Sequence, residues 1–117
     1  MINKNYKTPF VLSFLLIAVY SSTIFFTNKS IVALHYNFGL QPDRFGSKYE
    51  LIEIILINLS IVMILLYLST KPHLLNYPIE ITEQTKESAY HKMILFLGYL
   101  ALISTTIFTL TVLYSTL

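Results

Sequence analysis

The chain has 117 residues, of which 55% are hydrophobic and 12% are charged, and its mean hydropathy is +0.64. Soluble globular domains carry about 25% charged residues, so this composition indicates a membrane protein. The length allows one domain, predicted over 1–117, and leaves no room for a catalytic domain beside a membrane anchor. The net charge is +2 and the eight Lys and Arg residues are dispersed, so no basic patch for nucleic acid is visible. Cysteine is absent, which excludes disulfides, thiolate metal sites and cysteine catalysis.

Three long apolar segments predict three transmembrane helices, over about residues 9–27, 51–70 and 93–115. A helix of roughly 20 apolar residues crosses a ~30 Å hydrocarbon core, and each segment meets that length. Pro9 suits the first turn of a helix, where its missing N–H costs nothing. Lys4 and Lys7 precede this segment as in a signal peptide, but no A-x-A cleavage site follows. We therefore predict that the first segment is an uncleaved signal-anchor helix.

The second segment contains two polar residues of interest, Glu53 near its beginning and Asn58 in its interior. An intramembrane carboxylate is a functional candidate, because burying one costs several kcal/mol. Since Glu53 lies only two residues after Leu51, we expect it instead to reach interfacial water or to pair with Lys48.

The third segment has no charged residue but carries a stripe of small residues, spaced three or four apart: Gly98, Ala101, Thr105 and Thr109. Such a stripe is typical of close helix packing in lipid, although random placement in a threonine-rich helix would also produce it. We predict that the stripe faces a protein neighbour, either the second segment or another subunit. The positions expected to face lipid are Leu100, Ile103 and Ile107.

The distribution of Lys and Arg between the short loops predicts the orientation. The N-terminal tail and the second loop, 71–92, together carry five of these residues, whereas the first loop, 28–50, carries three. The positive-inside rule then places the N-terminus and the second loop in the cytoplasm. The first loop and the C-terminus are expected outside.

The first loop is expected to form a structured cap rich in aromatic residues. Gly39, Pro42 and Gly46 require at least two turns. Aromatic rings settle at headgroup depth and dock irregular backbone onto the bilayer. Combined with the three spans, this loop gives an all-α integral membrane protein as the expected fold class. Its aromatic residues are Tyr36, Phe38, Phe45 and Tyr49.

Polar residues of this loop raise two chemical alternatives. His35, Asn37 and Asp43 have metal-ligand chemistry, but the loop has no second histidine at ligand spacing. His35 and Asp43 could form a general base, yet the loop offers only serine hydroxyls as nucleophiles. We therefore expect no metal, no cofactor and no catalytic residue. Instead, we predict that His35, Asn37, Asp43 and Lys48 form one hydrogen-bonded cluster.

Two motifs make the chain resemble a known family. The first comprises His35, Asn37, Pro42, Asp43, Arg44, Phe45, Gly46, Ser47 and Lys48, and the second comprises Asn76, Tyr77, Pro78 and Thr82. Both resemble a bacterial membrane domain of unknown function that occurs alone and at the N-terminus of SdpI-like immunity proteins. Two positions depart from its pattern. Leu40 occupies the place of the family glycine, with Gly39 one residue early, and Ala33 replaces a proline.

The second loop is expected to combine an extended part with the beginning of the third helix. Pro72 and Pro78 favour extended or turning backbone over residues 71–79. Thr82 can then cap a helix that has Glu83 in its first turn. We therefore expect the third helix to begin well before the membrane, with either a solvated face or a surface for a cytoplasmic partner.

These observations favour a small non-catalytic protein of the bacterial cytoplasmic (inner) membrane. We expect it to lie in the lipid bilayer and to act as an accessory protein or subunit. Its partner is expected to be another membrane protein or a further copy of the chain in a homo-oligomer. The SdpI-like resemblance implies a role in envelope protection or immunity. The alternative is an oligomeric channel or transporter component, which would bring Glu53 and Asn58 around a pore.

Overall fold

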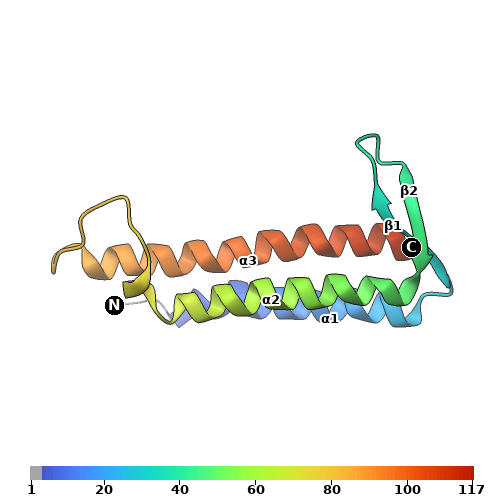
Figure 1. The fold of residues 1–117 in the computed structure, drawn as a ribbon. Helices are drawn as coiled ribbons and strands as arrows, with labels where there is room; N and C mark the ends of the chain where they lie inside the picture. Colours follow the sequence, from blue (N-terminus) through green and yellow to red (C-terminus); the bar gives the residue numbers. More distant parts are fainter. Residues whose placement is uncertain (1–3) are drawn as a thin grey trace.

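The computed structural model describes residues 4–117, with side-chain surroundings from residue 6 onward. Residues 1–3 of the predicted domain lie outside the described residues. Three long helices run side by side, and a hairpin of two strands leaves the bundle at one end (Figure 1). The helices are α1 (Thr8–Phe26), α2 (Ile52–Ser69) and α3 (Lys86–Thr116), and the strands are β1 (Ile31–Tyr36) and β2 (Pro42–Ser47). Short 3-10 helices are η1 (Lys4–Lys7), η2 (Lys48–Leu51) and η3 (Pro72–Leu74).

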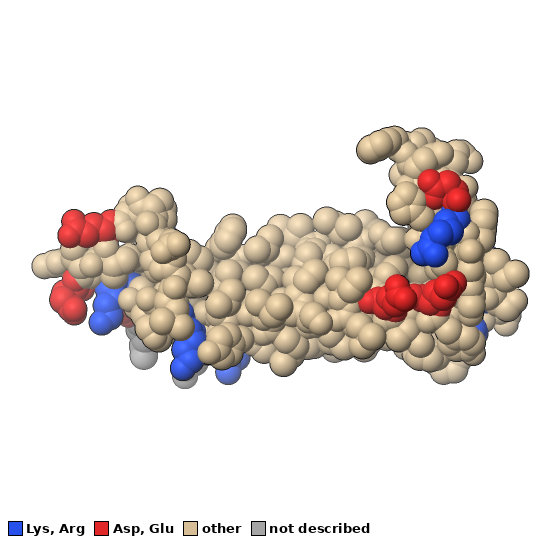
Figure 2. All heavy atoms as spheres, in the orientation of Figure 1, with Lys and Arg blue, Asp and Glu red and all other residues tan. Residues whose placement is uncertain are grey.

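The three helices have the length and composition needed to cross a membrane. The qualifying segments are Thr8–Phe26, Lys48–Ser69 and Lys86–Thr116. Charged side chains gather at the two ends of the molecule, and an uncharged belt separates them (Figure 2). This distribution matches a bilayer, in which a charged side chain at the centre is costly. The predicted membrane character and three spans are therefore supported.

The prediction of an all-α fold was wrong for the first loop. Residues 31–36 and 42–47 form an antiparallel sheet of two strands. The register is irregular on either side of His35, which opposes Arg44. This irregularity breaks the simple alternation by which a strand is identified in a sequence.

The third helix begins before the predicted membrane segment, as expected, but Thr82 does not cap it. The helix begins at Lys86, after a turn in which the Lys86 amide donates to the Thr82 carbonyl (2.9 Å). The Thr82 hydroxyl accepts instead from the Thr85 amide at 3.3 Å. Thr82 therefore organises the turn that precedes the helix.

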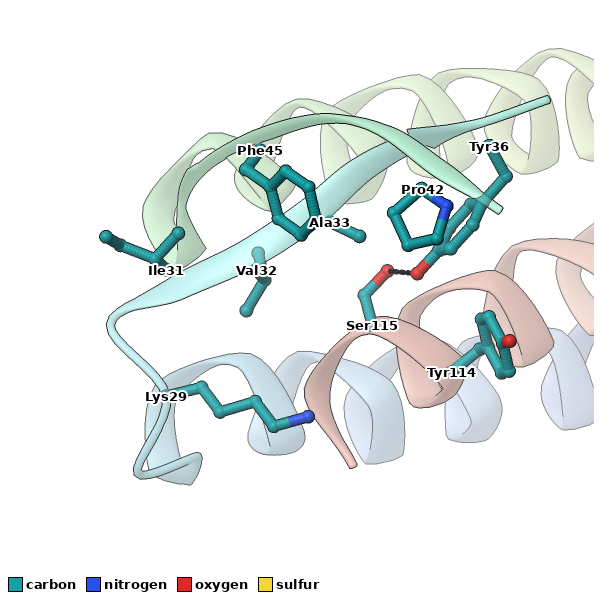
Figure 3. A pocket seen from close by; sticks show the side chains of 9 residues that line it. All are labelled: Lys29, Ile31, Val32, Ala33, Tyr36, Pro42, Phe45, Tyr114 and Ser115. Carbon is teal, nitrogen blue, oxygen red and sulfur yellow. Dashed lines mark hydrogen bonds between the residues drawn. The ribbon is translucent and has the colours of Figure 1, made fainter. Parts of the chain in front are cut away.

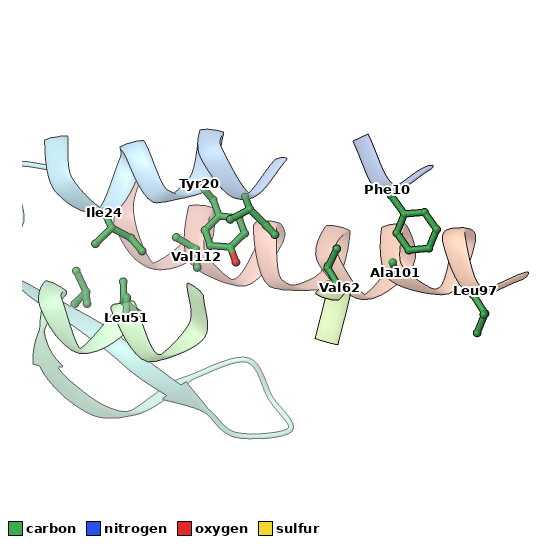
Figure 4. Close-up of a cluster of buried hydrophobic side chains, with 10 residues drawn as sticks. Phe10, Tyr20, Ile24, Leu51, Val62, Leu97, Ala101 and Val112 are labelled. Carbon is green, nitrogen blue, oxygen red and sulfur yellow. The ribbon is translucent and has the colours of Figure 1, made fainter. Parts of the chain in front are cut away.

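The small-residue stripe of α3 faces protein, as predicted. Ala101 and Thr105 are completely buried, whereas Ile103 and Ile107 are about 60% exposed. The principal neighbour is α1, since a Cβ at Gly98 would lie 3.2 Å from Pro9 Cβ. Figure 4 shows Phe10 of α1 beside Ala101. The expected neighbour was the second segment or another subunit. In the structure α2 contributes only part of the contact, and the main contribution comes from α1, which was not predicted.

A series of buried, hydrogen-bonded polar side chains joins all three helices. The Tyr20 hydroxyl of α1 donates to Asn58 Oδ1 of α2 at 2.8 Å. Asn58 Nδ2 in turn donates to Thr105 Oγ1 of α3 at 3.0 Å. Among the described residues, each buried side-chain N or O atom has a hydrogen-bond partner. Asn58 is therefore committed to helix association within one copy of the chain.

Candidate functional site

The hairpin is fixed to the bundle through β1. Val32 and Ala33 are buried, and Val32 belongs to the apolar core of the bundle. The Tyr36 and Ser115 hydroxyls lie 2.9 Å apart, so one donates to the other. The Tyr36 ring also packs against Tyr114, with ring centroids 5.1 Å apart. Because these contacts join β1 to the last turns of α3, the hairpin and the bundle form one unit.

Lys48 ties the base of the hairpin to the end of α1. Its Nζ donates to the carbonyls of Phe25 and Thr27, each at 3.2 Å. The last carbonyls of a helix have no partner within the helix and carry partial negative charge. A lysine at this position both satisfies them and favours the helix dipole. Lys48 therefore bonds to the end of α1, and not to Glu53 or His35 as predicted.

His35 and Asp43 form a separate pair across the two strands. His35 Nδ1 and Asp43 Oδ1 are 2.7 Å apart, and the two side chains are 67% and 44% exposed. Asn37 lies in the turn, where its Oδ1 accepts from the amides of Gly39 (2.9 Å) and Gln41 (3.0 Å). The predicted four-residue cluster was therefore wrong. The irregular register beside His35 brings Asp43 within reach of it, whereas Asn37 lies in the turn and Lys48 at the base of the hairpin. The four residues therefore make three separate sets of contacts.

Removing the exposed pair should have little effect on stability. We expect Asp43→Ala to lower the free energy of unfolding by less than about 1 kcal/mol, because exposed ion pairs contribute little. A double-mutant cycle with His35→Ala, measured by unfolding in detergent, should give a coupling energy of the same small size. A coupling energy above about 2 kcal/mol would show that the pair fixes the hairpin.

The turn of the hairpin holds a leucine in an unusual backbone conformation. Leu40 has a φ of 60°, whereas neither Gly39 nor any other described glycine has a positive φ. A side chain costs energy in this left-handed region, which glycine occupies freely. Leu40 stands where the SdpI-like pattern has a glycine, and its backbone conformation is one that suits glycine.

Leu40→Gly should stabilise the hairpin turn. We expect the free energy of unfolding in detergent to rise by about 0.5–1 kcal/mol, because relief of strain exceeds the flexibility gained by the unfolded chain. Hydrogen exchange at the Gly39 and Gln41 amides should slow in parallel. Gly39→Ala is the control, since its φ is negative, and it should not slow that exchange. A faster exchange in Leu40→Gly would contradict this interpretation.

The remaining residues of the first motif divide between structure and surface. Ser47 Oγ accepts from the Tyr49 amide (3.2 Å) and so begins η2. Gly46 permits close approach, because a Cβ there would collide with the side chains of Leu34 and Glu50. By contrast, three consecutive residues of β2 after Pro42 are exposed: Asp43, Arg44 and Phe45.

A crevice of about 470 Å³ separates the hairpin from the end of α3 (Figure 3). Apolar side chains form most of its wall, including Val32 and Phe45, and the bonded hydroxyls of Tyr36 and Ser115 line one side. Lys29 supplies a cation at its edge. The crevice thus combines an apolar surface with one positive charge.

Glu53 lies at the surface of the first turn of α2, where a carboxylate interacts favourably with the helix dipole. It borders a small cavity of about 160 Å³ together with Arg44 and Glu50. Figure 2 shows this group of charges at the hairpin end of the molecule. The interfacial position of Glu53 stays a prediction, whereas its expected partner Lys48 bonds instead to the end of α1.

The second motif lies at the opposite end of the bundle. The Tyr77 hydroxyl donates to the Pro72 carbonyl (2.6 Å), and its ring lies 5.6 Å from that of Tyr90. Burial, and then the charge of Tyr90, raise the pKa of Tyr77 above its ordinary 10.0, so the hydroxyl remains a donor. Asn76 and Pro78 are exposed. The two motifs therefore do not form one site.

Over residues 4–117, no three His, Asp or Glu side chains are grouped as metal ligands would be. A comparison with known protein families, curated proteins and solved structures finds no match to this chain. The SdpI-like resemblance therefore stays a prediction from the two motifs.

Proposed function

We propose that this chain is a non-catalytic accessory protein or subunit of the bacterial cytoplasmic membrane, and that it binds a membrane-protein partner through β2. In this proposal the N-terminus is cytoplasmic, and the hairpin and C-terminus are outside. The resemblance to SdpI-like proteins extends the proposal to envelope protection or immunity.

The observation that carries the proposal is the exposure of Asp43, Arg44 and Phe45 on a strand that pairs with β1. Motif residues with a purely structural role, such as Lys48, make contacts within the fold. Asp43 bonds to the exposed His35, and Phe45 and Arg44 border cavities, yet the carboxylate, the aromatic ring and the guanidinium all remain accessible to a partner. Aromatic residues and arginine are enriched where proteins bind one another.

The alternative of a channel or transporter component has less support. It requires Glu53 and Asn58 to line a common passage. The Asn58 side chain is fully buried and bonded to Tyr20 and Thr105. Glu53 is exposed and lies five residues earlier on α2, hence on a different face of the helix.

Photocrosslinking in living cells tests the proposal. A photoreactive phenylalanine analogue at Phe45 should give a discrete protein adduct, and Arg44→Glu should abolish it. The matched control is the same analogue at Leu56, which is equally exposed but lies within α2 (61% and 60%). A Phe45 probe that forms no protein adduct would contradict the proposal, as would the same adduct formed equally from Leu56.

A further inference from the structure

The turn of the hairpin carries two apolar side chains that the fold leaves uncovered. Phe38 is 110% exposed and Leu40 is 69% exposed. The turn backbone is nevertheless ordered by the two bonds to Asn37 Oδ1. The turn is therefore a built structure that presents apolar groups outward.

The direction of the hairpin determines what these groups meet. Figure 1 shows the hairpin leaving the bundle sideways, across the direction of the helices, with its turn away from them. The 19 residues of α1 span about 28 Å, close to the thickness of the hydrocarbon core. Because β1 begins at Ile31, shortly after α1 ends at Phe26, the hairpin begins near the headgroup level. An element that leaves sideways at this level runs along the membrane surface.

Leu40 provides an independent observation. It occupies a left-handed conformation at φ 60°, yet its side chain is mostly exposed and so gains little from the fold. Strained residues cluster at functional positions, where the surrounding structure holds them in place. Glycine would fit the backbone but would supply no apolar group.

We propose that Phe38 and Leu40 anchor the hairpin in the bilayer, with both side chains inserted at the boundary between headgroups and acyl chains. Aromatic rings favour this depth. A lipid surface fits the turn better than a second copy of the chain. Two side chains can bury far less surface than the roughly 800 Å² per partner that a stable protein interface buries. The anchor would hold β2 at a fixed height beside the bundle. It goes beyond the proposed protein contact, which uses Phe45.

The chain has no tryptophan, so Phe38→Trp gives a single fluorescent reporter. It would be reconstituted in vesicles of phosphatidylcholine and phosphatidylglycerol, with and without bromine near the headgroup end of the acyl chains. Two references calibrate the result: Leu56→Trp on the apolar surface of α2, and Glu83→Trp in the exposed turn before α3. For an interfacial residue, we expect brominated lipid to quench Phe38→Trp and acrylamide to quench it about threefold less than Glu83→Trp.

Two results would overturn the anchor. The first is acrylamide quenching equal to that of Glu83→Trp without quenching by brominated lipid, which would place the turn in water. The second is protection from both quenchers, which would show contact with protein. Adding Leu40→Gly to the reporter should reduce lipid quenching about twofold while the turn stays folded, because glycine fits φ 60°. Gly39→Ala in the same background should leave lipid quenching unchanged.

Discussion

Asn58→Ala should lower the free energy of unfolding by about 2–3 kcal/mol, since it removes both hydrogen bonds between helices and leaves a cavity. The Tyr20 and Thr105 hydroxyls would lose partners in a seam that water does not reach, and orphaned polar groups are costly there. Unfolding the protein in mixed micelles, by raising the proportion of a denaturing detergent, measures this loss of free energy.

Ser60→Ala is the matched control, because Ser60 lies two residues further along α2 but is exposed. Its hydroxyl donates to the Leu56 carbonyl of its own helix at 2.8 Å and joins no other element. We expect a change within about 0.5 kcal/mol. Equal effects of the two substitutions would show that Asn58 does not hold the three helices together.

Ala101→Leu should be destabilising by about 2–3 kcal/mol or prevent folding, because Ala101 is completely buried where α3 meets α1. The added methyl groups have no space beside Phe10, so the helices would have to separate. Stability in detergent, and yield of the folded protein, measure the effect.

Ile103→Leu and Ile107→Leu conserve volume on the opposite face of α3, at positions that are 59% and 60% exposed. Both should leave stability unchanged within about 0.5 kcal/mol. If Ala101→Leu were tolerated as well as these two, the small-residue stripe would have no packing role.

The sequence was most informative where the signal is local. Apolar length identified all three spans, and a spacing of three and four identified the buried face of α3 around Ala101. Both follow from the geometry of a single helix in a membrane. The neighbour of that face was not identified, because Pro9 and Phe10 meet α3 only through the packing of the whole bundle.

The hairpin shows where local patterns are insufficient. The bulges beside His35 disturb the alternation of β1, and the positive φ of the turn falls on Leu40 and not on the neighbouring Gly39. With the strands unrecognised, His35 and Lys48 were assigned to one cluster. Within the predicted cluster only His35 and Asp43 bond to each other, because they are near neighbours across the strands, whereas Asn37 lies in the turn and Lys48 at the base.

Three spans place the hairpin and the second loop on opposite sides of the membrane (Figure 1). Because the chain has no cysteine, Ser30→Cys and Ser88→Cys each provide a single thiol at an exposed position. In intact cells, an impermeant maleimide should label Ser30→Cys, and it should label Ser88→Cys only after the membrane is permeabilised. Labelling of Ser88→Cys alone would reverse the orientation, and equal labelling of both in intact cells would show that the two loops do not lie on opposite sides of the membrane.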